Sequence, residues 1–263
     1  MYDLRKLSIL IILTFSAPFL TPAQGHEATV SSADVALEER LGAEIPQGIL
    51  LRDETGKTVD LKDLADKPTI IAPVYYRCTH TCPLMLTGLA EALGKLQIVE
   101  PGRDYRVIAI SFDDRDTPEI AREKKPNYLT AINRPFPAEA WSFLTGDSAN
   151  IRKFTDAIGF RVQRTGEDFT HPIALVVLAP GGKIVRYLHG ITFLPFNITM
   201  AVTEAAQGKI GSTAGRVLTY CFSYDPLKNS YAFNILKVVG TVVVLSLLLF
   251  FIYLMRAGRK TTR

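Results

Sequence analysis

Residues 69–83 read TIIAPVYYRCTHTCP, and the fold prediction rests on this stretch. Its first half, Thr69–Tyr76, is an apolar run rich in β-formers and predicts a buried strand. Leucines at mostly helical spacing follow from Pro83 onward, so a helix is expected directly after the strand. The junction carries Cys78 and Cys82 to the carboxyl edge of a sheet, where α/β proteins place their functional sites.

On both sides of this junction the chain alternates predicted strands and helices. We expect a hairpin over 48–60, a short turn at 61–64, strands at 105–112, 142–144, 173–178 and 183–188, and helices at 83–97, 117–129, 148–158 and 196–207. This order predicts an α/β domain over residues 46–210, with three layers and a mixed central sheet.

Both ends of the chain predict an exported, anchored protein. Residues 1–24 combine a short basic start, an apolar run and small residues, which is typical of a secretory signal peptide. Residues 238–255 carry no charge, and basic residues follow them. We therefore expect a transmembrane helix at 235–256, with a cytoplasmic tail at 257–263.

The resulting topology is a single pass through the inner membrane, with the domain on the periplasmic side. Residues 25–45 are polar and are expected to form a flexible arm, and 211–234 a juxtamembrane segment. The formal net charge of +4 is mild and gives no reason to expect a nucleic-acid partner.

The two close cysteines leave three interpretations open. Three residues separate Cys78 from Cys82, whereas a thioredoxin-type redox motif has two. The wider loop suits a soft clamp of two thiolates, which copper(I) or zinc would prefer. A redox-active dithiol is the main alternative, and a purely structural disulfide would stabilise little because it closes a short loop.

A histidine is the natural third ligand beside two thiolates. His171 stands just before the apolar strand at 173–178, and the pattern favours it over His189 at the end of the next strand. His80 lies between the cysteines, where a chelate is sterically awkward, so an exposed side chain is expected. His26 falls in the polar arm and is expected to be solvated.

Three motifs in this order resemble the Sco/SenC family. They are CTHTCP at 78–83, SFDDRDTP at 111–118, and His171 before a hairpin strand, and the resemblance covers roughly residues 45–209. It implies a thioredoxin-like fold and copper bound by Cys78, Cys82 and His171. It also implies a role in building the dinuclear copper centre of cytochrome c oxidase. The C-terminal anchor looks like that of a bacterial subgroup.

The implied partners are the copper-bearing subunit of the oxidase, a copper donor and a thiol reductant. The sequence departs from the family at Asp114, where a proline is common, and at Pro172, which replaces a small polar residue. These departures affect loop shape and hence partner choice. The first hypothesis is a non-enzymatic copper chaperone; the alternatives are a membrane-anchored thiol-disulfide oxidoreductase and a redox or copper sensor.

The loop at 113–116 and Cys221 are each open to more than one interpretation. Asp113 and Asp116 flank Arg115, and we favour a solvated, helix-capping turn over a loop that orders the site or docks a partner. Cys221 is either a buried apolar side chain, an accessory copper ligand or a free thiol.

Overall fold

The computed structural model describes residues 35–211, 222–225, 230–233, 243, 246–248 and 250. The predicted signal peptide, His26 and Cys221 lie outside these residues, as does most of the predicted transmembrane segment. Among the described residues, no helix is both long and apolar enough to cross a membrane.

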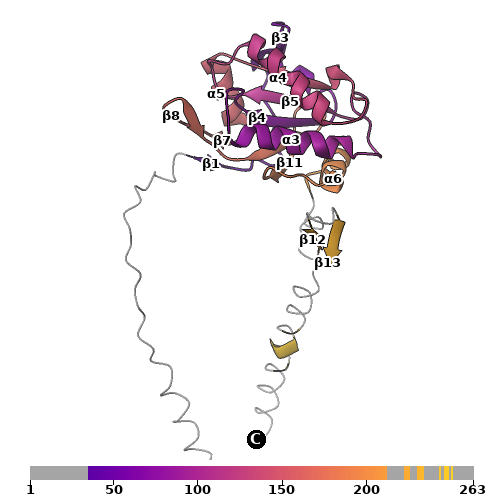
Figure 1. The fold of residues 1–263 in the computed structure, drawn as a ribbon. Helices are drawn as coiled ribbons and strands as arrows, with labels where there is room; N and C mark the ends of the chain where they lie inside the picture. Colours follow the sequence, from indigo (N-terminus) through magenta and orange to yellow (C-terminus); the bar gives the residue numbers. More distant parts are fainter. Residues whose placement is uncertain are drawn as a thin grey trace, which may run out of the picture. The chain divides into compact units, whose positions relative to one another are not determined.

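A mixed five-stranded sheet forms the centre of the domain, as the sequence predicts (Figure 1). Its strand order is β11-β10-β4-β5-β6. Strands β4, β5 and β6 are parallel, whereas β10 is antiparallel to both β4 and β11. The strands are β4 (Thr69–Val74), β5 (Arg106–Ser111), β6 (Trp141–Leu144), β10 (Ala174–Leu178) and β11 (Ile184–His189).

The register of these strands brings three loops to one edge of the sheet. Val74 lies opposite Ser111 in the parallel pair β4–β5, so both strands end at the same edge. Val176 lies opposite Ile71 in the antiparallel pair, so β10 begins at that edge with Ala174. The loop after β4, the loop after β5 and the loop before β10 therefore converge.

Helices cover the sheet, and α3 contacts both α4 and α6. The helices are α2 (Leu61–Leu64), α3 (Thr81–Gly94), α4 (Pro118–Ala131), α5 (Ser148–Ala157) and α6 (Pro195–Ala206), with a 3-10 turn at Ala138–Ala140. Helix α3 begins at Thr81, two residues before the predicted start at Pro83. A proline fits inside a first helical turn because those N–H groups have no partner within the helix. Cys82 is therefore helical.

Short hairpins surround the central sheet. Strands β2 (Leu50–Arg52) and β3 (Thr58–Asp60) form the hairpin predicted over 48–60. Strands β8 (Gln163–Thr165) and β9 (Asp168–Thr170) form a second one that the sequence reading missed. Its turn contains Gly166 with a φ of 66°, a conformation that favours glycine. Strands β12 (Phe222–Asp225) and β13 (Ser230–Phe233) pair with each other.

The packed domain starts earlier in the chain than residue 46, the boundary expected from the sequence. Strand β1 (Ala36–Leu37) pairs with β7 (Phe160–Arg161). Ile45 is fully buried, and the backbone of Glu44 pairs with that of Lys183 in an isolated antiparallel β-bridge. The second half of the predicted flexible arm therefore packs against the domain.

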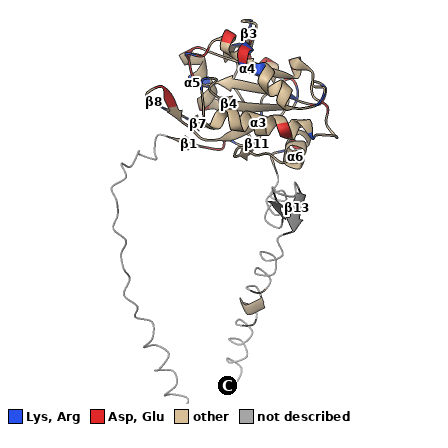
Figure 2. Cartoon of the chain, in the orientation of Figure 1, with Lys and Arg blue, Asp and Glu red and all other residues tan. Residues whose placement is uncertain are grey.

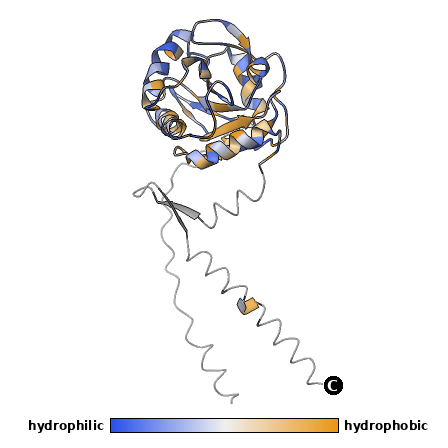
Figure 3. Ribbon diagram, turned by 90° about the vertical axis from the view of Figure 1, so that its right-hand side faces the viewer, coloured by the Kyte–Doolittle hydropathy of each residue, from blue (hydrophilic) through white to orange (hydrophobic). Residues whose placement is uncertain are grey.

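Apolar side chains fill the space between the sheet and the helices. Strands β4 and β10 are buried along their whole length, and Figure 3 shows hydrophobic colour concentrated in the central strands, with mixed colour along the helices. The largest fully buried side chains include Trp141, Tyr105 and Phe143. This core supports the edge at which the three loops meet.

Candidate functional site

The structure brings Cys82 and His171 together at the sheet edge. Cys82 lies in the first turn of α3, and His171 lies between β9 and β10. The Sγ atom of Cys82 is 3.7 Å from Nε2 of His171. Cys78 precedes the same helix and is 6% exposed, while Cys82 is 2% exposed. Neither of these two cysteines is in a disulfide.

The hydrogen bonds of His171 determine which ring nitrogen faces the sulfur. Nδ1 lies 2.7 Å from the carbonyl oxygen of Pro172. A carbonyl only accepts, so in the neutral imidazole Nδ1 carries the proton and Nε2 keeps its lone pair. That lone pair faces Cys82 and the hydroxyl of Thr81, whose Oγ1 is 3.4 Å from Nε2. The imidazole is therefore in the tautomer that a metal ligand requires.

The spacing of these two groups matches that of two ligands on one metal ion. Taking typical zinc distances of about 2.3 Å to sulfur and about 2.0 Å to imidazole nitrogen, an angle of about 110–120° separates the two ligand atoms by about 3.5–3.7 Å. The observed separation of Cys82 Sγ and His171 Nε2 is 3.7 Å. Among the described residues, no three His, Cys, Asp or Glu side chains already form a complete metal site. For all three predicted ligands to hold one ion, Cys78 would have to move closer to Cys82 and His171.

Cys78 is the more acidic of the two thiols. A hydrogen bond from Cys82 lowers the pKa of Cys78 to about 4, against the effect of burial; the Tyr75 hydroxyl and the backbone N–H groups of Cys82 and His80 add to the lowering. The same hydrogen bond, together with burial, raises the pKa of Cys82 well above its usual range. The pair therefore consists of one thiolate and one thiol, the second donating to the first.

Aromatic rings surround His171. Its ring centroid lies 5.1 Å from that of Phe112, 5.9 Å from Tyr75 and 6.4 Å from Phe160. Burial raises the pKa of Tyr75, and its neighbour Cys78 raises it further, so its hydroxyl keeps its proton. That hydroxyl donates to Asp168 Oδ1 at 3.2 Å. The site is thus enclosed by apolar surface on the side away from solvent.

The loop after β5 differs from the prediction of a solvated, capping turn. Asp113 is fully buried, and Asp116 is 5% exposed. Asp116 accepts hydrogen bonds from the N–H of Tyr76 at 2.6 Å and from Ser111 Oγ at 2.7 Å. Thr117 precedes α4 but makes no side-chain capping bond. That prediction was wrong because both carboxylates face inward: Asp116 finds buried donors there, and Asp113 is covered by the guanidinium groups of Arg115 and Arg164.

His80 has the exposed side chain expected of it, and His189 is paired with a residue outside the cysteine loop. His80 is exposed, and its Nδ1 lies 3.1 Å from Thr79 Oγ1. His189 Nε2 lies 2.8 Å from Glu39 Oε1, so its ring has a partner away from the cysteines. The sequence reading missed Tyr75, Phe112 and the β8–β9 hairpin as parts of the site; the Gly166 turn was the signal that could have revealed the hairpin.

Comparison with known proteins identifies relatives of this chain. The SCO1/SenC family model matches residues 39–207. Protein SenC of Rhodobacter capsulatus is 37% identical over 82 residues, which are 31% of this chain and 36% of SenC. The chain therefore matches about a third of the length of that curated relative.

Solved structures share the fold over most of their length. A protein of Aquifex aeolicus VF5, named as a candidate electron transfer protein, is 34% identical with a TM-score of 0.57, covering 64% of this chain and 95% of its own. Arabidopsis thaliana ScoI, solved with copper bound, is 22% identical with a TM-score of 0.51, covering 63% of this chain and 99% of its own. BsSco, described as having a disulfide switch and as a member of the Sco family of cytochrome c oxidase assembly proteins, has the same identity and TM-score, covering 66% of this chain and 99% of its own.

Proposed function

Because the chain belongs to the SCO1/SenC family, we propose that it is a copper chaperone for assembly of the dinuclear copper centre of cytochrome c oxidase. Cys78, Cys82 and His171 are the proposed ligands of its copper cargo. The observation that carries this proposal is the 3.7 Å separation of Cys82 Sγ and Nε2 of His171, a ring whose Nδ1 faces the Pro172 carbonyl. Structures of relatives with bound copper support the choice of metal.

The chemistry of the three groups suits copper(I). Two thiolates and one imidazole form a soft, three-coordinate site. Cys78 is already ionised, because its pKa is about 4, so only the Cys82 thiol has to lose its proton when copper binds. Release to a client proceeds by exchange of these ligands for the client's thiolates. A disulfide between Cys78 and Cys82 would remove both sulfur ligands and block loading.

A thiol-disulfide oxidoreductase is the second candidate, and the unequal cysteine pair favours it. The Cys78 thiolate would attack a disulfide of an apo copper site, forming a mixed disulfide and releasing one client thiolate. Cys82 would then lose its proton and attack the Cys78 sulfur. The products are a Cys78–Cys82 disulfide and a client with two reduced cysteines, so two electrons pass to the client.

Copper binding by the full-length, reduced protein separates the two functions. The chaperone proposal predicts one copper(I) per chain, strongly weakened in His171→Ala and unchanged in the control His189→Ala. An oxidoreductase needs only the two cysteines, so His171→Ala should retain reduction of a disulfide-bonded client peptide. Equal copper affinity in wild type and His171→Ala would contradict the ligand assignment.

For location, we propose a single-pass protein of the inner membrane with the copper site on the periplasmic side. The proposal rests on the signal-like residues 1–24 and the uncharged run at 238–255. Within that run, Val243, Leu247 and Phe250 are helical and exposed, which is the surface that a lipid-facing helix presents. The proposed partners are the copper-bearing oxidase subunit, a copper donor and a thiol reductant. Labelling of intact spheroplasts with a membrane-impermeant thiol reagent tests the topology, since the reagent reaches Cys78 and Cys221 only if they lie on the periplasmic side.

A further inference from the structure

The β8–β9 hairpin, which is marked by the β8 label in Figure 1, is followed directly in the chain by His171. It is a separate two-stranded sheet of three residues per strand. Such a hairpin is marginally stable in water when it stands alone. Most of its residues are exposed, and among them only Phe169 packs against the main core. The position of His171 therefore depends on contacts that fasten this hairpin to the domain.

A buried carboxylate on the neighbouring loop provides such a contact through Arg115. Asp113 is fully buried and accepts hydrogen bonds from Arg115 Nε at 3.0 Å and Nη2 at 2.9 Å. The other side of the same guanidinium reaches the hairpin turn: Nη1 donates to Glu167 Oε2 at 2.7 Å and Nη2 to the Glu167 carbonyl at 3.0 Å. The acidic end of the hairpin is red beside the β8 label in Figure 2. Arg115 thus bridges Asp113 and the turn.

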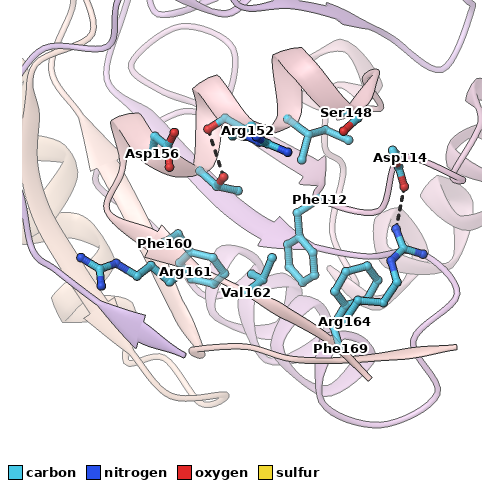
Figure 4. A pocket seen from close by; sticks show the side chains of 12 residues that line it. Phe112, Asp114, Ser148, Arg152, Asp156, Phe160, Arg161, Val162, Arg164 and Phe169 are labelled. Atoms are coloured by element: carbon cyan, nitrogen blue, oxygen red, sulfur yellow. Dashed lines mark hydrogen bonds and ion pairs between the residues drawn. The ribbon is translucent and has the colours of Figure 1, made fainter. Parts of the chain in front are cut away.

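A second arginine, which belongs to the hairpin, reaches back to the loop after β5. Arg164 belongs to β8, and its Nη2 donates to Asp113 Oδ1 at 3.2 Å and to Asp114 Oδ1 at 2.6 Å. Its guanidinium also lies 4.6 Å from the centroid of Phe169. Figure 4 shows Arg164 pointing to Asp114 beside Phe169, at the edge of a pocket of about 490 Å³. Planar guanidinium groups suit such two-sided contacts, which a lysine ammonium does not reproduce.

We propose that Arg115 and Arg164 are positioning residues for His171, acting through the shared carboxylate of Asp113. Together these three residues form a clamp that holds the hairpin so that Nε2 of His171 stays beside Cys82. This inference rests on the proposed function, because its consequence appears at the copper site. The bond from Tyr75 to Asp168 is a third link between the hairpin and the cysteine loop.

The clamp acts on a local equilibrium rather than on the fold as a whole. The side chains of Arg115 and Arg164 are 32% and 37% exposed, and partly exposed ion pairs contribute little to global stability. A small exposed hairpin opens locally at much lower free energy than the core. Loss of the clamp should therefore release His171 while the central sheet stays intact.

A double-mutant cycle with the full-length protein tests this inference. We expect Arg115→Gln combined with Arg164→Gln to weaken copper(I) binding by about 10-fold, measured by competition with a colorimetric chelator, because loss of groups that orient a metal ligand typically has an effect of this size. In a His171→Ala background the same two substitutions should have no further effect. The control Arg103→Gln removes an exposed arginine paired with Asp104 at the same 2.9 Å and should leave affinity unchanged.

Hydrogen exchange provides a second measurement that does not depend on copper. Amides of residues 163–170 should exchange faster in the clamp variant, while those of β4 and β10 keep their protection. Unchanged copper affinity together with unchanged exchange overturns the clamp, and so does an equal loss of affinity in the His171→Ala background. If wild type and His171→Ala bind copper(I) equally, the proposed function itself is contradicted. If His171→Ala weakens binding but the clamp variant does not, only the clamp fails.

Discussion

Nε2 of His171 and Sγ of Cys82 lie 3.7 Å apart, although the two residues are 89 positions apart in the sequence. The contact exists because β10 runs antiparallel to β4, which brings the start of one strand beside the end of the other. The carbonyl of Pro172 then fixes the imidazole tautomer. A strand register and a single hydrogen bond thus prepare a nitrogen ligand next to a pair of thiols.

The acidity of Cys78 should depend on the group at position 82. In Cys82→Ala the hydrogen bond to Cys78 is lost, and we expect the pKa of Cys78 to rise from about 4 toward its ordinary value of 9.0. Cys82→Ser keeps a donor and should leave Cys78 acidic. The pH dependence of alkylation, followed by mass spectrometry of the peptide that contains Cys78, measures both. A Cys82→Ala profile identical to that of the wild type would show that Cys82 does not control the thiolate.

Asp113 should make stability depend on pH in acid. Burial opposes its ionisation, but the hydrogen bonds from Arg115 outweigh burial and hold the pKa of Asp113 below 3.8. Ionised Asp113 therefore stabilises the fold above that pH, and its contribution is lost as the pH falls through the lower, folded-state value. We expect Asp113→Asn to reduce the free energy of unfolding by about 1 kcal/mol at pH 7, the upper end for partly exposed ion pairs.

Urea titrations of wild type and Asp113→Asn at pH 7 and at pH 3 test this expectation, since the difference between them should shrink in acid. The comparison has to be made between the two proteins, because burial raises the pKa of Asp116 and gives that group the opposite pH dependence. A difference that stays constant or grows as the pH falls would show that Asp113 is not stabilised as a carboxylate.

Close packing of α3 against the loop after β11 should make Gly88 intolerant of a side chain. A Cβ atom at this position would lie 2.0 Å from the carbonyl oxygen of Ile191. Gly88→Ala should therefore lower the free energy of unfolding by about 1–3 kcal/mol, although alanine normally stabilises a helix. Glu91→Ala, exposed on the same helix, is the control and should change it by less than about 0.5 kcal/mol. A stabilised Gly88→Ala would disprove the contact.

Regular patterns made the centre of the fold predictable. The apolar run of β4, the glycines after β10 and the hairpin order of β10 and β11 lead to the mixed sheet by local rules of periodicity and turn chemistry. The cysteines were found for the same reason, because a strand-to-helix junction is a local feature. Family resemblance, more than pattern, selected His171 over His189.

Long-range contacts made the rest unpredictable. The β8–β9 hairpin has almost no apolar alternation, and Arg115 and Arg164 hold it by reaching across more than 50 positions to shared partners. The inward orientation of Asp113 and Asp116 likewise depends on donors that the fold brings together. The local sequence around Asp113 and Asp116 predicts only an ordinary helix-capping turn.

X-ray absorption of the full-length protein loaded with copper(I) tests the copper site most directly. For wild type we predict two sulfur ligands and one imidazole nitrogen around each copper ion. In His171→Ala the imidazole scattering should disappear while the two sulfurs remain, and His189→Ala should give the wild-type spectrum. Imidazole scattering that survives in His171→Ala, or a wild-type site with sulfur ligands alone, would contradict the assignment of His171 as the third ligand.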